Sequence, residues 1–237
     1  MLDLLQVECA HDGVALRGLM AVPQGKGPFP TVLVMHSALG LRHMVEEKAR
    51  TLAGLGYTAI ATDMYGVDAD LGSPEKAGQY YMQLLQDGPK LRERCALWFD
   101  TASSLATVDP DNIAAIGFCF GGQCVLELAR SGRNLKAAVS YHGLLTTHAP
   151  AAKGDIKGEI VAWCGARDPF GPPADTVAFR AEMEAAEANW QITEWGKVAH
   201  GFTDPKAEGA MPGIEYHPIA DAVSWAGTVA LLEHVFQ

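Results

Sequence analysis

One segment, Gly117–Gly122, constrains the fold of this chain more than any other. It reads Gly-Phe-Cys-Phe-Gly-Gly and connects a short apolar run, Asn112–Ile116, to an apolar segment with helical spacing, Gln123–Arg130. A strand, a tight glycine-flanked turn and a helix form the context of a nucleophile elbow, here with a thiol as the nucleophile. The turn leaves no room for side chains two positions either side of Cys119, which itself takes a strained backbone conformation. The positive end of the following helix favours the thiolate. The alternative is a buried structural cysteine, which the glycine spacing disfavours.

Strand-like and helix-like segments alternate along most of the chain. Two extended runs near the start, Leu4–Cys9 and Val14–Val22, flank Asp12 and Gly13, and this dipeptide is a hairpin signal. The alternation that follows predicts a mostly parallel sheet with right-handed crossovers. We therefore expect an α/β-hydrolase fold with an antiparallel N-terminal hairpin, helices on both faces of the sheet, and a single domain over residues 1–237. The other expected strands cover 31–35, 57–62, 112–116, 137–140, 160–163 and 191–195. The expected helices cover 45–53, 74–106 with a break near 88, 123–130, 173–188 and 222–232.

Composition narrows the kinds of partner. The net charge is −10 and no run of Lys or Arg is present, so nucleic acid and anionic membranes are not expected as partners. The first residues do not read as a signal peptide, and no apolar run approaches the roughly 18 residues that span a bilayer. Five scattered cysteines form no Cys-x-x-Cys pair, which predicts a reduced, cytoplasmic setting. We expect a small-molecule substrate and no metal or organic cofactor, and the sequence specifies no oligomeric state.

Two residues downstream complete a nucleophile–acid–base order. A thiolate nucleophile needs a base, and the base needs an acid to orient it. Asp168 follows the expected strand 160–163, and His200 follows the next expected strand. In an elbow fold the chain order is nucleophile, Asp or Glu, then His. An aspartate before a proline also suits a simple turn, and eight histidines make a chance placement plausible for His200 alone. The three residues in this order, each after a strand, favour a triad.

With these residues, the chain resembles the dienelactone hydrolases (carboxymethylenebutenolidases) of the α/β-hydrolase superfamily. The resemblance covers most of the chain, and the Gly-Phe-Cys-x-Gly-Gly stretch is its specific part. The further matching segments are His36-Ser37-Ala38-Leu39-Gly40, Gly56-Tyr57, Asp63-Met64-Tyr65-Gly66, Tyr141-His142-Gly143, Gly165-Ala166-Arg167-Asp168 and His200-Gly201-Phe202.

The resemblance implies site residues. The family's triad falls on Cys119, Asp168 and His200. Its oxyanion hole implies backbone N–H donors at Phe120 and, from the loop after the first central strand, Ala38. Candidate pocket residues are His36, Ser37, Tyr65 and Tyr141. For His36 a positioning role is favoured over proton transfer, and Tyr141 either edges the pocket or is a core tyrosine. The aromatic residues of 74–106, Tyr81 included, are expected mainly in the core, although a cap over the site would come from this region.

Two positions depart from the family's pattern. Family members usually carry Glu where this chain has Ser37, so activation of Cys119 is expected to rest on His200 and the helix dipole. The namesake enzymes bind a substrate carboxylate with arginines, whereas this chain has Asp204 near one such position and offers only Lys76 as a weak candidate for another. We therefore expect a neutral or apolar ester or lactone, hydrolysed through a covalent thiol-bound intermediate. Activated phosphotriesters are a secondary expectation because the same donors suit a phosphoryl oxygen.

Two other functions remain open from the residues. The elbow, followed by Gln123, also looks like that of class I glutamine amidotransferases, and His217-Pro218 lies downstream. Those enzymes follow His-Pro with Glu, whereas residue 219 here is Ile. The other alternative is a non-catalytic binding module on the same fold, because a fold alone does not define an activity.

Overall fold

Eight strands form one sheet in the computed structural model, which describes residues 2–206 and 211–237. The strand order is β1-β2-β4-β3-β5-β6-β7-β8. The pairs from β4 across to β8 are parallel, whereas β1 with β2 and β2 with β4 are antiparallel. The strands are β1 (Leu5–His11), β2 (Val14–Ala21), β3 (Phe29–Met35), β4 (Thr58–Thr62), β5 (Val108–Phe118), β6 (Ala137–Tyr141), β7 (Glu159–Gly165) and β8 (Asn189–Trp195).

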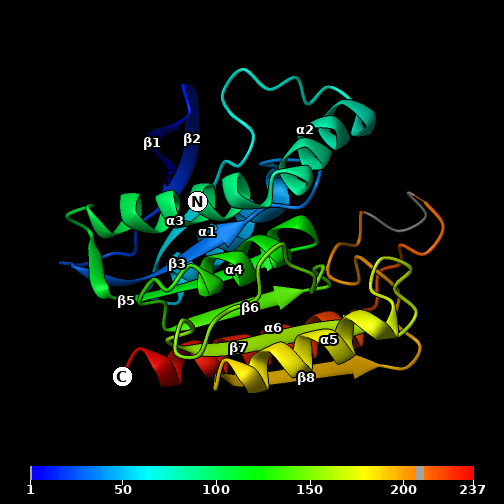
Figure 1. Ribbon diagram of the computed structural model, residues 1–237. Helices are drawn as coiled ribbons and strands as arrows, with labels where there is room; N and C mark the ends of the chain where they lie inside the picture. The colour runs from blue at the N-terminus through cyan, green and yellow to red at the C-terminus, as the bar shows by residue number, and fades with distance from the viewer. Residues whose placement is uncertain (1, 207–210) are drawn as a thin grey trace.

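Helices cover both faces of this sheet (Figure 1). They are α1 (His43–Gly54), α2 (Pro74–Gln86), α3 (Gly88–Ser103), α4 (Phe120–Arg130), α5 (Pro173–Ala185) and α6 (Pro218–Val235). Two buried apolar clusters follow from this layering. One joins the sheet to α2, α3, α4 and α5, and the other joins its opposite face to α1 and α6. The predicted α/β fold with its N-terminal hairpin is thus confirmed, while a single domain over 1–237 stays a prediction.

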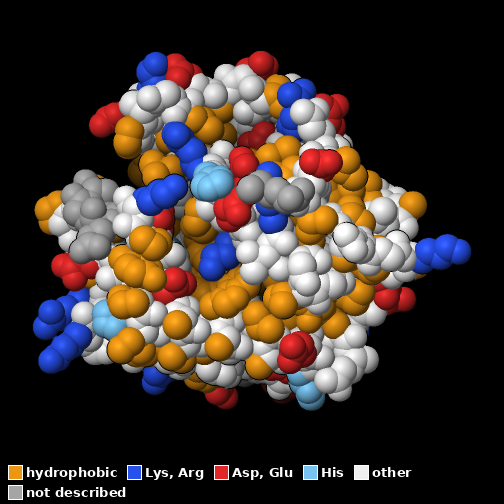
Figure 2. Space-filling view, turned by 180° about the vertical axis from the view of Figure 1, so that it is seen from behind, with side chains coloured by type: hydrophobic (Ala, Val, Ile, Leu, Met, Phe, Trp, Pro, Cys, Tyr) orange, Lys and Arg blue, Asp and Glu red, His pale blue; other side chains and the backbone are white. Residues whose placement is uncertain are grey.

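The opposite face, seen from behind in Figure 2, carries apolar side chains beside scattered charged ones. Ile219 and Val223 of α6 are among the exposed apolar residues. Among the described residues, none of the helices has the length and apolar character needed to cross a bilayer.

The sheet positions the chemistry at one edge. Strands β3, β5, β7 and β8 are parallel, so their carboxyl ends lie at the same edge, where ligands bind in open α/β sheets. Cys119 follows β5, and Asp168 and His200 follow β7 and β8. The loop that contains Ala38 follows β3 at the same edge.

Candidate active site

Cys119 stands between β5 and α4 in a strained conformation. Its φ is 55° and its ψ is −115°, which places a non-glycine residue in the left-handed half of backbone space. Three flanking glycines make this turn sterically feasible. A Cβ on Gly117 would overlap the carbonyl of Gly121, and a Cβ on Gly121 would overlap that of Met35. Tight packing around the turn therefore stabilises the strained backbone conformation of Cys119.

Hydrogen bonds fix the backbone of the nucleophile. The N–H of Cys119 donates to the carbonyl oxygen of Tyr141 at 3.0 Å and to Nδ1 of His142 at 3.2 Å. The ring of His142 must then carry its proton on Nε2, which lies 2.9 Å from Oγ1 of Thr203. Burial, followed by the charge of His200, holds the pKa of His142 well below its ordinary value. His142 is therefore a neutral support of the elbow, at a positive φ of 41°.

The other two expected triad residues meet in the structure. Nδ1 of His200 lies 2.7 Å from Oδ2 of Asp168, and the two side chains are 5% and 8% exposed. Asp168 is itself fixed because its Oδ1 accepts the N–H of Phe170 at 2.8 Å. The backbone of His200 is held from both sides, since its N–H donates to Gly213 and its carbonyl accepts from Glu215.

The electrostatics of the site favour a thiolate beside an imidazolium. Burial alone raises the pKa of the Cys119 thiol, but the hydrogen bond and charge of His200, with the N–H groups of Ala38 and Phe120, outweigh it and lower that pKa. Burial lowers the pKa of His200, yet its hydrogen bonds to Asp168 and Cys119 raise it to about 10. Both shifts favour a proton on the imidazole and a negative charge on the sulfur.

The Ala38 loop is supported from beneath by His36. Nδ1 of His36 lies 2.7 Å from the carbonyl oxygen of Ser37, and its Nε2 accepts the N–H of Met64 at 3.1 Å. The ring is completely buried, and burial lowers its pKa. His36 therefore holds a loop in place rather than lining a pocket. Oγ of Ser37 accepts the N–H of Leu39 at 3.4 Å.

Tyr65 braces the same loop from the side. Its hydroxyl donates to the carbonyl oxygen of Ala38 at 3.0 Å, and its ring stacks on Phe120 with centroids 5.8 Å apart. Tyr65 thus joins the two residues whose N–H groups face the thiol. Tyr141, in contrast, does not lie with the other pocket candidates. Its ring is 1% exposed in the cluster under α6, and its hydroxyl bonds Oγ1 of Thr228. Tyr141 is a core tyrosine because alternate residues of β6 point to opposite faces.

Three aromatic or imidazole groups near the site were not predicted from the sequence. Tyr81 of α2 packs edge-on against Phe120 at 5.3 Å and lies close enough to feel the charge of Cys119. Phe170 is 42% exposed and packs edge-on against His200 at 4.9 Å. His142 packs edge-on against His200 at 4.8 Å. The only sequence signal for them was position, since each lies in the expected cap or just after a strand.

The described residues contain no group of three or more His, Cys, Asp or Glu that could hold a metal ion. The chain belongs to the class of the α/β hydrolases. It has their mostly parallel sheet, a thiol at the elbow, a histidine bonded to an aspartate, and two N–H groups that face the thiol. Within that class it belongs to the dienelactone hydrolase family, whose sequence model matches residues 16–236.

Individual relatives agree with this assignment. The solved structure of m3DLH is 35% identical, with a TM-score of 0.93 over 100% of this chain and 99% of that one. A dienelactone hydrolase-like promiscuous phosphotriesterase from metagenomic libraries is 33% identical, with a TM-score of 0.91 over 100% of this chain and 99% of its own. A Synechocystis protein named as a candidate carboxymethylenebutenolidase is 27% identical over 83% of this chain and 85% of its own.

Proposed function

We propose that this dienelactone hydrolase-family protein cleaves small neutral esters or lactones through a thioester on Cys119. The observation that carries the proposal is the convergence on one sulfur of the His200 imidazole and the N–H groups of Ala38 and Phe120. These are the groups that an acyl transfer needs, namely a nucleophile, a proton carrier and donors for the oxyanion.

The reaction proceeds in two halves. The Cys119 thiolate attacks the carbonyl carbon, and the oxyanion accepts hydrogen bonds from the N–H groups of Ala38 and Phe120. The carbonyl re-forms as the bond to the leaving oxygen breaks, and the imidazolium of His200 gives that oxygen its proton. The neutral imidazole then takes a proton from water, the hydroxide attacks the thioester, and the thiolate leaves. Asp168 holds the tautomer of His200 throughout.

The surroundings support a neutral substrate. The groups that set the pKa values of Cys119 and His200 are backbone amides, each other and Asp168, with no Lys or Arg among them. Aromatic rings of Tyr81 and Phe170 flank the two residues. A substrate carboxylate would find no Lys or Arg partner in this set, whereas an apolar acyl or alkoxy group would pack on the rings.

A panel of p-nitrophenyl esters and unsubstituted lactones tests the proposal. Wild type is expected to hydrolyse both, and Cys119→Ala is expected to lose turnover of every substrate. Cys124→Ala is the matched control, since Cys124 lies in the same helix with its thiol fully buried and its pKa raised by that burial. Full ester hydrolysis by Cys119→Ala would contradict the mechanism.

Activated phosphotriesters are the second candidate substrates. The structural similarity to a promiscuous phosphotriesterase favours them, and a phosphoryl oxygen can accept the same two N–H groups. We expect paraoxon to release p-nitrophenol. If water attacks the thiophosphoryl enzyme, release continues with turnover. If it does not, release stops after one equivalent of p-nitrophenol per enzyme. Release that persists in Cys119→Ala would exclude this use of the site. For the glutaminase alternative, glutamine should release no ammonia, and His217 serves here as the N-cap of α6.

A further inference from the structure

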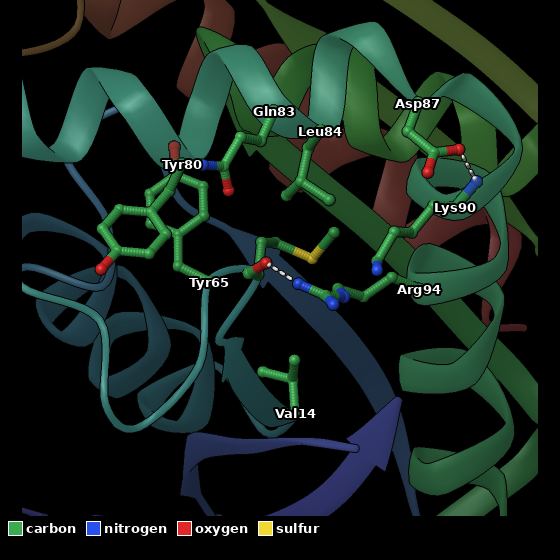
Figure 3. A pocket seen from close by; sticks show the side chains of 9 residues that line it. Val14, Tyr65, Tyr80, Gln83, Leu84, Asp87, Lys90 and Arg94 are labelled. Carbon is green, nitrogen blue, oxygen red and sulfur yellow. Dashed lines mark hydrogen bonds between the residues drawn. The ribbon is translucent and has the colours of Figure 1, made fainter. Parts of the chain in front are cut away.

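A cavity of about 280 Å³ lies between α2, α3 and the start of β2, and Cys119 does not line it (Figure 3). Tyr65 separates this cavity from the elbow. Its ring stacks on Phe120, next to Cys119, and also on Tyr80, which lines the cavity, with centroids 5.8 and 5.7 Å apart. The volume is close to the lower end of the range for small-molecule sites, about 300–1,000 Å³.

The cavity contains a buried cation that forms no ion pair among the described residues. Arg94 is 3% exposed, and its Nη1 donates to the carbonyl oxygen of Met64 at 2.7 Å. Its Nε lies 3.5 Å from Nδ1 of His11, and its Nη2 donates to no group within the described part of the chain. Burial lowers the pKa of Arg94, although the charges of Asp63 and Asp12 oppose this effect. A largely buried guanidinium beside a cavity, with an N–H group that bonds no described residue, can bind an anion there.

Lys90 supplies a second cation one helical turn before Arg94. Figure 3 shows both side chains extending from α3 toward the middle of the cavity. Two carboxylates lie close to Lys90, and one of them, Asp87, also lines the cavity. Its Nζ pairs with Asp12 at 3.1 Å, and its backbone N–H donates to Asp87, the N-cap of α3. The carboxylate of Asp12 is 58% exposed, so this ion pair is partly screened by water. Arg94 is therefore the main cation available to an anion inside the cavity, and Lys90, which already pairs with Asp12, is the second.

The remaining walls suit a flat apolar body. The rings of Tyr65 and Tyr80 form one side, and Leu84 and Val14 form others. Leu84 is 5% exposed and belongs to the core cluster, so this end of the cavity is rigid. The aromatic and aliphatic walls would bury a ring while the cationic end binds its charge.

We infer that this cavity binds a small carboxylate with a flat apolar body. Arg94 and Lys90 bind the carboxylate, and the body packs between Tyr65, Tyr80 and Leu84. The site is distinct from the elbow, so one chain carries a nucleophile for neutral acyl groups and a separate binding site for an organic acid.

Benzoate titrated into the full wild-type chain tests the inference, with amide shifts followed by ¹H–¹⁵N NMR. Benzoate is no ester, so the result is independent of the proposed hydrolysis. Saturable shifts are expected at the amides of Leu84, Lys90 and Arg94. Shifts confined to Ala38 and Phe120 would place benzoate at the elbow and overturn the inference, as would the absence of saturable shifts.

Benzamide is the ligand control, because it has the same shape without the charge. It is expected to bind at least about tenfold more weakly, the loss of one charge-assisted pair, and equal binding would overturn the inference. Arg94→Gln keeps a donor for Met64 and should weaken benzoate about tenfold. Lys90→Gln should weaken it severalfold, while Lys153→Gln, which removes an equal charge at a surface pair with Glu187, should not. Unchanged affinity in Lys90→Gln, with its spectrum otherwise native, would contradict the assignment without reliance on the buried Arg94.

Discussion

Replacing His200 by Ala should raise the pH at which Cys119 becomes reactive. In the wild type, burial raises the pKa of the thiol, and the hydrogen bond and charge of His200 more than offset this effect. Without the imidazole, burial is opposed only by the N–H groups of Ala38 and Phe120. The pKa of Cys119 should then move from below its ordinary value of 9.0 to that value or above.

The size of this shift follows from the ion pair. Two unit charges about 4 Å apart, at an effective dielectric constant near 20, interact by about 4 kcal/mol. Loss of this interaction should therefore move the midpoint of Cys119 labelling clearly to higher pH. The direction of the shift follows from the pKa of the thiol. The thiolate is present at pH values above that pKa, so raising the pKa moves the reactivity of Cys119 to higher pH. The ion pair exists only below the raised pKa of His200, about 10, because the imidazole is neutral at higher pH. Hydrolysis should therefore fall above about pH 10, whereas alkylation should not.

The assay is the rate of iodoacetamide labelling at the Cys119 peptide, measured by mass spectrometry from pH 5 to 11. Cys164 is the internal control, because burial raises its pKa to about 12 and should leave it unlabelled in both proteins at neutral pH. Circular dichroism confirms that the variant is folded. Equal midpoints in wild type and folded His200→Ala would show that the helix end and the amides alone activate the thiol, and would refute the ion-pair reasoning.

Three further substitutions test the support of the site. Tyr65→Phe keeps the ring stack but loses the bond to Ala38, so kcat should fall about fivefold, equivalent to about 1 kcal/mol, with an unchanged fold in the NMR spectrum. Gly121→Ala drives a Cβ into the backbone carbonyl of Met35 and should lower the free energy of unfolding, measured in urea, by about 1–3 kcal/mol or more. An unfolding midpoint equal to that of the wild type would contradict the packing described. Arg130→Met leaves the largely buried Glu182 of α5 without an ion pair, while Glu127 of α4 keeps its pair with Arg92. The change should cost about 3–5 kcal/mol, measured as a lower Tm, whereas removal of the exposed Arg133–Asp100 pair should change Tm little.

Local signals in the sequence were strong where a single physical requirement decides the structure. Asp12 and Gly13 both take positive φ in the tight turn between β1 and β2, as the dipeptide predicted. The break near Gly88 is also observed, with Pro89 in the first turn of α3. The order of Asp168 and His200 after successive strands was sufficient to predict that they lie at one edge, and their side chains meet at 2.7 Å.

Side-chain direction was harder to predict, because it depends on packing between distant segments. Tyr141 and His142 are adjacent in sequence, yet the tyrosine enters the core under α6 and the histidine supports the elbow. The positive φ of His142 turns its side chain, and no residue pattern signals that angle in a non-glycine residue. Tyr81 was expected mainly in the core, although a cap over the site was expected from the same region. Only the position of α2 over the sheet shows that its ring reaches the elbow.

The distribution of charge around Cys119 accounts for the lowered pKa of its thiol, next to a loop that carries the uncharged Ser37. A carboxylate beside a thiol opposes its ionisation, since like charges raise a pKa. At this elbow Asp168 is bonded to His200 and raises its pKa, which favours a positive charge on the imidazole beside the thiol. The thiol therefore faces a cation and two amides rather than an anion. These groups lower the pKa of the thiol without any contribution from a substrate. The chain's anion-recognition groups, Arg94 and Lys90, lie on the far side of Tyr65, where they cannot compete with His200 for the thiolate.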